Sequence, residues 1–470
     1  MMFRSINKII SACLLVTIML SACEKTVEID PPVNEITDEQ VFSSDRLAAS
    51  ALAGIYTGMA QSSAQSTIGP VNYSLFADDL TYVGSNTTLF ESFGNAYSTI
   101  SSIQTTVFSE WYTIIYRANA VIEGLQKYQG TSNQVKKQFT AEAKVIRAYC
   151  YFNLINSFGD VPLILETNAV VTATQPRETV SNIYTQIIAD LTVGKSDLPA
   201  DYAASSSTRL GVNKFVATAL LARVYLFMGN YTEAESNASE VIASSLYSLI
   251  PSANMATGVW TKNNAESIWQ MSSPLNPVNQ YTVEGSNFIP LTATIVPQYN
   301  IRASFLQQFE STDLRLRNWT RQYAFGTGTV TLPYKYKYPN NLLAVAAAVV
   351  ESPTVLRLAE QYLIRAEARA RIGTNLQGAL SDLNRIRARA QTTLSASATS
   401  TALLNETLAE FRKEFFCEQS HRWFNIKRLG QADAILSAIK TGYRPEAKLL
   451  PIPTAAIDAN PNLTQNPGYQ

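Results

Sequence analysis

The stretch Val212–Ser245 constrains the fold of this chain more than any other part of its sequence. Apolar residues recur in its first half at the spacing of one helix face: Ala217, Leu220, Leu221, Val224, Tyr225 and Met228. Gly229-Asn230 then interrupts the helix, and Tyr231–Ile242 begins a second amphipathic pattern with small residues along one side. Neither helix can bury its apolar face alone, so the pair needs further helices stacked against it.

Small and aromatic residues at fixed places make this hairpin resemble a tetratricopeptide unit: Ala222, Tyr225, Gly229, Tyr231, Ala234 and Ala238. A second pair of helical patterns, Leu356–Ile372 and Leu376–Ala390, is separated by Gly373 and has the same form. An ordinary helical hairpin of another α protein also fits the first stretch alone. The sequence predicts a mainly α protein, in which tetratricopeptide-like hairpins form a scaffold and long irregular regions are rich in aromatic residues.

The remaining pattern divides the chain into two regions. Helical periodicity in the first region, 38–245, predicts four further helices: Asp38–Met59, Ser98–Tyr128, Gln134–Phe158 and Thr179–Leu191. Residues 60–96 lack this period and are rich in Ser, Thr, Gly, Asn and aromatic residues, a composition typical of long functional loops. The second region, 246–470, comprises an irregular part (246–355), a helical part (356–430) that ends in an amphipathic helix over Leu403–Leu429, and a tail (431–470).

The N-terminus has the composition of a lipoprotein signal peptide. Two basic residues precede Ile9–Leu20, an apolar run that is too short to span a bilayer. Leu20-Ser21-Ala22-Cys23 resembles a bacterial lipobox, so we expect residues 1–22 to be removed and Cys23 to be acylated. Cys13 follows a similar triplet but leaves almost no apolar region before it, and a plain secretory signal cut elsewhere is the alternative. Residues 23–37 then form a lipid-anchored tether.

Composition excludes several classes of function. Removal of residues 1–22 takes two of the 37 Lys and Arg and none of the 37 Asp and Glu, which leaves a net charge near −2. This balance argues against nucleic acid or an anionic membrane face as the principal partner. Cys150 and Cys417 lie in helical patterns and are expected to be buried thiols. His421 is the only histidine, and no metal-site spacing is present, so we expect no metal, no other cofactor and no catalysis by another histidine.

Five short motifs, in one order along the chain, resemble the SusD/RagB family. They are Phe158–Leu163, Asp313-Leu314-Arg315, Glu410–Arg428, Leu449–Pro453, and the closing Asn460–Leu463 with Gln465–Tyr469. The resemblance implies a surface-exposed outer-membrane lipoprotein without catalytic activity that binds a nutrient, usually an oligosaccharide and in some members a peptide. It also implies a role as a hinged lid on a SusC-like TonB-dependent transporter, which the tetratricopeptide helices face. Acidic residues just behind Cys23 resemble the surface-export signal of Bacteroidota lipoproteins.

Binding of a sugar requires flat aromatic faces with polar groups at the rim. The loops offer such residues, and we expect the ligand site among Asp78, Phe90, Phe93, Trp260, Trp319 and Tyr323. The alternative is that each aromatic ring anchors a long loop to the core. Asp78-Asp79 is an improbable glycosidase pair, because adjacent residues of an extended chain point to opposite faces. Glu414, His421 and Arg422 are expected to form a satisfied polar face between packed helices.

Three functions therefore compete. The leading hypothesis is a nutrient-binding lid lipoprotein with an oligosaccharide ligand, or a peptide ligand as the alternative within the family. A surface glycoside hydrolase is disfavoured because no convincing acid/base pair is present. A tetratricopeptide scaffold that binds only protein is disfavoured by the long aromatic loop region, which such scaffolds lack. The sequence does not identify the nutrient.

Overall fold

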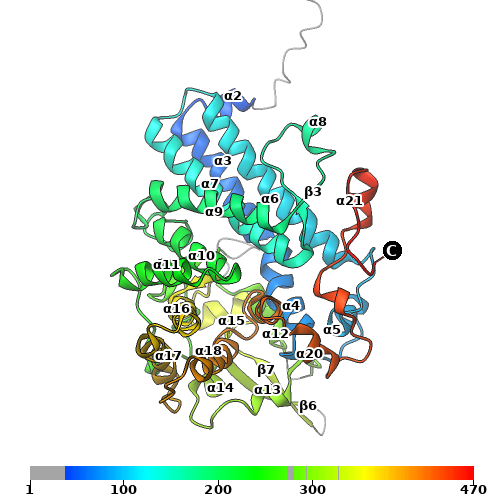
Figure 1. The fold of residues 1–470 in the computed structure, drawn as a ribbon, viewed down its shortest axis with the longest axis vertical. Coiled ribbons are helices and arrows are strands. Elements are labelled where there is room, and N and C mark those ends of the chain that lie inside the picture. Colours follow the sequence, from blue (N-terminus) through cyan, green and yellow to red (C-terminus); the bar gives the residue numbers. More distant parts are fainter. Residues whose placement is uncertain (1–36, 273–279, 293, 326–327, 470) are drawn as a thin grey trace, which may run out of the picture.

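The fold is described by a computed structural model that covers residues 37–272, 280–292, 294–325 and 328–469. The signal peptide, Cys23 and nearly all of the 23–37 tether lie outside these residues. Helices dominate, as the sequence predicts, and the strands are short (Figure 1). Within the described part of the chain, none of the helices combines the length and apolarity needed to cross a membrane.

The N-terminal region is built from helices that pack in sequence order, and all but the first are long. They are α2 (Asp38–Val41), α3 (Asp45–Gln61), α6 (Ser102–Lys127), α7 (Asn133–Phe158), α9 (Val180–Asp197), α10 (Lys214–Phe227) and α11 (Tyr231–Ala243). The predicted helix Asp38–Met59 is two helices, because α2 ends at Val41 and a new helix begins after Ser44. The Ser44 side chain caps α3 by accepting a hydrogen bond from the Leu47 amide. Between α7 and α9 lie β2 (Val161–Pro162), α8 (Ala169–Thr172) and β3 (Arg177–Glu178).

Residues 60–96 are more regular and more buried than their composition suggests. They form a π-helix (η1, Ala64–Asn72), α4 (Tyr73–Phe76), β1 (Leu80–Tyr82) and α5 (Thr87–Gly94). Polar side chains in η1 are buried because they find partners inside the protein. The Gln65 side chain, for example, accepts a hydrogen bond from the Tyr149 hydroxyl at 2.7 Å. The prediction of one long irregular segment was therefore wrong here.

The two predicted helical hairpins are present and lie side by side. In the second hairpin, α16 (Leu358–Ile372) packs against α17 (Leu376–Ala390), and α11 of the first hairpin packs against α16 (Figure 1). The hairpin form is confirmed, whereas its assignment to the tetratricopeptide class stays a prediction. The expected single helix Leu403–Leu429 is two helices, α18 (Ser400–Phe415) and α19 (His421–Arg428), because Cys417 and Gln419 between them adopt positive φ.

The irregular part joins segments that are far apart in the sequence. Its elements are η3 (Ser252–Asn254), β4 (Ser267–Gln270), α12 (Val283–Phe288), β5 (Tyr299–Ile301), α13 (Ala303–Leu306), α14 (Leu314–Trp319), β6 (Thr320–Phe325), β7 (Gly328–Pro333), α15 (Asn341–Ala346) and β8 (Thr354–Arg357). Antiparallel pairing joins β1 with β5, β4 with β8, and β6 with β7. The β1–β5 pair ties the segment after α4 to the second half of the chain, with Tyr82 opposite Tyr299.

The tail returns to the N-terminal helices. It contains α20 (Ala432–Ser437), η4 (Pro445–Lys448) and α21 (Thr454–Ala459). The Asn466 amide donates to the Phe158 carbonyl at the end of α7 and to the Leu450 carbonyl. Two of the sequence motifs, Phe158–Leu163 and Gln465–Tyr469, therefore meet in the fold. Cys150 and Cys417 are both buried thiols, as expected.

Candidate functional site

Asp78 is an anchor of the C-terminal helices. Its carboxylate accepts from Nε and Nη2 of Arg422 at 2.7 and 2.9 Å, and Nη2 of Arg412 lies 2.9 Å from its Oδ2 atom. Burial favours the neutral acid, but the hydrogen bonds and charge of Arg422 outweigh burial and lower the pKa of Asp78. Asp79 is paired with Arg412 in the same cluster. Asp78 is buried and its oxygens are occupied, so it does not stand at the rim of a site as the sequence suggested.

Trp260 and Trp319 lie in the core and have no exposed ring face. Their rings pack edge to face, with centroids 5.3 Å apart, and the Trp319 Nε1 atom donates to the Met255 carbonyl at 2.9 Å. The Lys335 Nζ atom lies 5.3 and 4.9 Å from the two ring centroids. Both residues are therefore core anchors, which was the alternative to a role in ligand binding. Their expected placement at the ligand site was wrong.

A buried ionic junction lies next to these tryptophans. Arg357 donates from Nε to Glu418 at 2.9 Å and from Nη1 to Glu266 at 3.0 Å, and it also contacts Glu414. Arg315 contacts Asp313, Glu410 and Glu414 at 2.8, 2.6 and 3.2 Å. We define the junction as Glu266, Asp313, Arg315, Lys335, Arg357, Arg389, Glu410, Glu414 and Glu418.

The junction explains two of the five motifs. Asp313-Leu314-Arg315 and the glutamates of Glu410–Arg428 supply ion pairs that hold α18 against α14 and β8. Burial disfavours the Glu414 carboxylate, but Arg389, Arg357 and Arg315 together bring the pKa of Glu414 far below its usual range. The expectation of a satisfied polar face is confirmed for Glu414, and Arg422 is paired with Asp78 through two of its three nitrogen atoms. The His421 ring, in contrast, has no side-chain hydrogen bond to the residues that the structure describes.

Phe90, Phe93 and Tyr323 lie in a different setting, on elements that reach the surface. Phe90 is 62% exposed on α5, a helix that Asn86 caps through the Leu89 amide. Phe93 is half-buried on the same helix, with the Arg302 guanidinium carbon 5.4 Å from its ring centroid. Tyr323 is half-buried on β6, and its hydroxyl donates to the Thr292 carbonyl at 2.7 Å.

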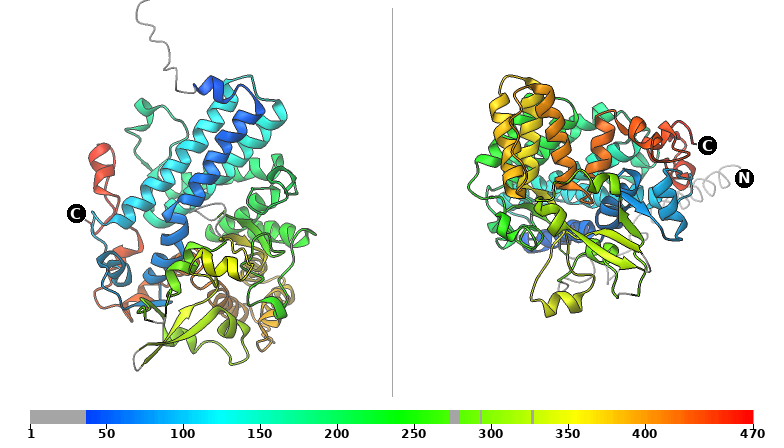
Figure 2. Two further views of the ribbon diagram at one scale, coloured as in Figure 1. Left: turned by 180° about the vertical axis from the view of Figure 1, so that it is seen from behind. Right: turned by 90° about the horizontal axis from the view of Figure 1, so that it is seen from below.

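Backbone pairing brings these three residues into one neighbourhood. The Val83 amide extends the β1–β5 ladder by donating to the Gln298 carbonyl at 3.0 Å, and the Thr331 amide of β7 donates to the Asn300 side chain at 2.9 Å. Helix α5 and the β6–β7 hairpin therefore flank β1 and β5. In the view from below, α5 (blue) and the β6–β7 strands (yellow-green) lie on the side away from α16 and α17 (yellow-orange) (Figure 2, right).

Further exposed apolar residues, which the sequence did not single out, lie on or beside the same elements. Exposed Val83 follows β1, Leu291, Ile295 and Val296 lie in the loop before β5, and Phe325 ends β6. We call this set the aromatic edge: Val83, Phe90, Phe93, Leu291, Ile295, Val296, Tyr323 and Phe325. The one sequence signal for Val83, Leu291, Ile295 and Val296 is the presence of aliphatic residues in polar loops, whereas Phe325 is an aromatic residue of the kind already expected at the site. Scattered apolar exposure is common, but gathered exposure marks interaction sites.

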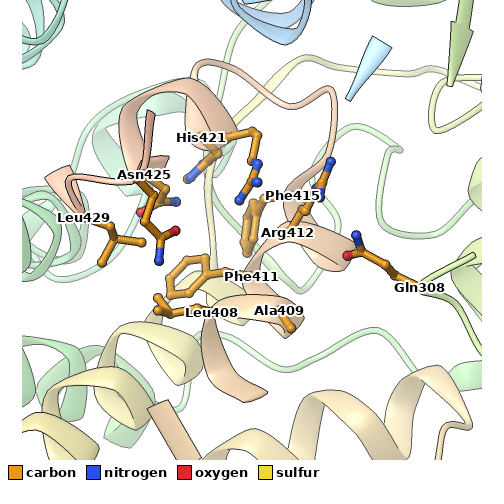
Figure 3. A pocket seen from close by; sticks show the side chains of 11 residues that line it. Gln308, Leu408, Ala409, Phe411, Arg412, Phe415, His421, Asn425 and Leu429 are labelled. Carbon is orange, nitrogen blue, oxygen red and sulfur yellow. The ribbon is translucent and has the colours of Figure 1, made fainter. Parts of the chain in front are cut away.

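A separate polar cavity of about 180 Å³ lies between α18 and α19 (Figure 3). His421, which the sequence analysis expected to be satisfied, lines it together with Arg412 and Arg422. The described residues contain no group of three or more His, Cys, Asp or Glu side chains that could hold a metal ion.

Two family models match the chain, one on each half. Residues 32–226 match the model described as "Starch-binding associating with outer membrane", and residues 258–469 match the SusD family model. A SusD-like protein of Formosa agariphila is 23% identical, with 96% of this chain and 97% of that protein covered.

Solved structures agree with this match. A SusD superfamily protein of Bacteroides thetaiotaomicron is similar with a TM-score of 0.76 and 24% identity, over 90% of this chain and 100% of that one. A surface glycan-binding protein A of Bacteroides fluxus is similar with a TM-score of 0.73 and 22% identity, over 90% of this chain and 99% of that one. At these identities the likeness shows a shared fold.

Proposed function

Because this chain belongs to the SusD family, we propose that it is a surface lipoprotein of the outer membrane that binds an oligosaccharide nutrient and passes it to a SusC-like TonB-dependent transporter. The observation that carries the proposal is the match of both halves of the chain to models of this family. A relative of the same fold is named for glycan binding, which supports a carbohydrate ligand over a peptide.

We place the ligand on the aromatic edge. Phe90 offers an exposed ring, and Tyr323 and Phe93 offer partly exposed ones, beside aliphatic side chains that suit the CH faces of sugars. A rigid frame supports these elements, because the Asp78 cluster and the ionic junction fix the helices behind them. The arrangement favours binding over hydrolysis, since the adjacent carboxylates Asp78 and Asp79 are both held by arginines.

Binding is tested with the purified chain from residue 24 onward. We expect it to retain one or more polysaccharides in an affinity gel or by titration calorimetry and to release no reducing sugar from them. Retention of peptides in place of glycans would support the peptide-binding alternative. Turnover that Asp78→Asn abolishes would overturn the proposal and make the protein a glycoside hydrolase.

Attachment to the membrane rests on Cys23, which lies outside the described residues. We expect Cys23→Ala to release the protein from membranes or to leave its signal uncleaved, and Cys13→Ala to change neither. Protease added to intact cells should remove the wild-type protein if it faces the exterior. Lipid found at Cys13 would contradict the placement of the anchor.

An exposed apolar helix supports a protein partner as well. Helix α15 presents Leu342, Leu343 and Val345 to solvent, with Leu342 76% exposed. We expect the wild-type protein to co-purify with a TonB-dependent transporter of its host and Leu342→Glu to be retained less well. Equal retention of the two proteins would show that α15 does not contact the transporter. The hairpins α10–α11 and α16–α17 would then be the expected contact surface.

A further inference from the structure

The cavity between α18 and α19 has a strongly polar wall. Six polar side chains contribute to it: Gln308, Arg412, His421, Arg422, Asn425 and Gln431. Figure 3 shows Phe411, Arg412 and Phe415 on one side and His421 and Asn425 on the other, with Gln308 at the far end. The spacing of the helices produces this arrangement, because residues 408, 411, 412 and 415 share one face of α18, and 421, 425 and 429 share one face of α19.

Two guanidinium groups reach this wall already fixed in position. Arg422 binds Asp78 through Nε and Nη2, and Arg412 binds Asp78 and Asp79 through the same two atoms. The remaining Nη1 atom of each arginine has no acceptor among the described residues. Because the fork is planar and rigid, these two donors are held on the edge opposite to the aspartates.

The neutral side chains of the wall add both donors and acceptors. The Asn425 Oδ1 atom accepts from Arg428 at 2.6 Å, which leaves the amide NH₂ of Asn425 free to donate. Gln308 uses its NH₂ group in a weak contact with the Ser304 carbonyl, which leaves its oxygen free to accept. Donors therefore outnumber acceptors, as a site for an anion that also carries hydroxyl groups requires.

His421 is neutral and lies over an aromatic ring. Burial first, and then the charges of Arg223, Arg357, Lys335 and Arg428, hold the pKa of His421 well below its usual range. Its ring centroid is 4.5 Å from that of the buried Phe415, which holds the imidazole at the cavity wall. A neutral imidazole offers one donor and one acceptor, which suits a sugar hydroxyl.

The cavity has room for one sugar ring. A volume of about 180 Å³ is roughly that of six water molecules at liquid density. This is enough for one sugar ring. We propose that the cavity is a second ligand site, distinct from the aromatic edge, that binds one hexuronate ring, with its carboxylate on Arg412 and Arg422 and its hydroxyl groups on Gln308, His421 and Asn425.

The lone histidine makes the test direct. The chain from residue 24 onward, with any purification tag removed and histidine labelled with ¹³C, gives a single imidazole signal set from His421. We expect galacturonate or glucuronate to shift these signals saturably. Galactose, which has CH₂OH in place of the carboxylate, and sodium sulfate, which lacks the ring, are expected to bind at least tenfold more weakly.

A matched pair of variants localises the effect. Ala409 is exposed at the cavity wall, and it lies one turn before Arg412 on α18. Ala409→Glu places a negative charge there and is expected to bind uronate about threefold or more weakly than Ala409→Gln, which adds a side chain of the same size without the charge. Both residues are good helix formers, so stability should not differ.

Four outcomes would overturn this inference. They are no saturable shift with uronate, an equal response to galactose, an equal response to sulfate, and equal uronate affinities of the Ala409→Glu and Ala409→Gln proteins. None of them decides whether a polysaccharide binds at the aromatic edge. That question is tested separately, by the polysaccharide affinity of Phe90→Ala. The two proposals can therefore fail independently.

Discussion

The tryptophans beside the ionic junction and the rings of the aromatic edge come from the same kind of sequence and have opposite properties. Both draw on loop-rich stretches with prominent aromatic residues, and the sequence analysis treated their rings alike. In the structure Trp260 and Trp319 are enclosed beside buried cations, whereas Phe90 is 62% exposed on a short helix. The difference teaches that residue type alone does not show whether an aromatic residue in a loop belongs to the core or to the surface. The rings beside Arg357 and Lys335 are enclosed in the core with those cations, while the rings of the aromatic edge keep exposed surface that is available to a ligand.

The junction also shows why so many charges can be buried here. Each carboxylate meets at least one arginine or lysine, and Glu414 meets three arginines. Ion pairs of this kind add little net stability when complete, but removal of one member leaves the others desolvated and unpaired. The edge has no such dependence, because its side chains are partly in water. Substitutions should therefore separate the two regions by their effects on stability and on binding.

The largest expected effect is the loss of Arg357. Arg357→Met leaves Glu266, Glu414 and Glu418 without their shared partner and should lower the free energy of unfolding by about 3–5 kcal/mol. Lys137→Met is the control, because its pair with Asp197 is exposed and should contribute about 0–1 kcal/mol. Urea unfolding of both variants measures the difference. A loss below 1 kcal/mol for Arg357→Met would refute the account of the junction.

Loss of a core tryptophan should be nearly as costly. Trp319→Ala removes a fully buried ring that packs on Trp260 and donates to Met255, and it should cost about 3–5 kcal/mol of stability. Glycan affinity, measured where the variant is still folded, should stay within about twofold of the wild type. If Trp319→Ala keeps its melting temperature and loses binding, the comparison is reversed and Trp319 belongs to the ligand site.

The sequence predicted the frame better than the site. Periodic patterns such as Ala217–Met228 and Leu376–Ala390 gave helices, because one apolar face per helix is enough to specify it. Residues 60–96 were misjudged because hydrogen bonds from distant residues, such as Tyr149 to Gln65, bury polar side chains that look like loop residues. The break at Cys417 and Gln419 was missed because nothing in their residue types favours positive φ.

The site depends on pairings that no local pattern encodes. Asp78 lies in a stretch whose composition suggests the rim of a binding site. Its role as a buried anchor depends on ion pairs with Arg412 and Arg422, which lie more than 300 positions away in the chain. The aromatic edge likewise depends on the pairing of β1 with β5 and of β6 with β7. Phe90, Phe93 and Tyr323 were identified by residue type, and their ligand contact stays a prediction.

The free energy of unfolding should depend on pH through Glu284, a buried carboxyl group of α12. Burial raises the pKa of Glu284 to about 7 from a reference of 4.5, so the folded state holds a proton that the unfolded state has released between these values. Stability is therefore full below about pH 4.5 and falls as the pH rises toward 7, by about 3 kcal/mol.

Glu284→Gln tests this by replacing the neutral acid with a neutral amide. The difference in unfolding free energy between the variant and the wild type should grow in favour of the variant between pH 5 and pH 8, because all other titrations are shared. Urea unfolding at the two pH values measures it. Parallel pH dependences in the two proteins would show that Glu284 ionises in the folded state as freely as in the unfolded one.

The smallest effect on stability and the most specific effect on binding are expected at the aromatic edge. Phe90→Ala removes an exposed ring, so it should change the free energy of unfolding by less than about 0.5 kcal/mol. Loss of the stack should cost about 1 kcal/mol of binding, which is about fivefold in affinity for the retained polysaccharide. Tyr323→Phe is the matched control on β6, because it keeps the ring and removes only the hydroxyl that donates to Thr292. If Phe90→Ala and Tyr323→Ala both bind like the wild type at unchanged melting temperature, the ligand lies elsewhere, and exposure alone does not mark the site.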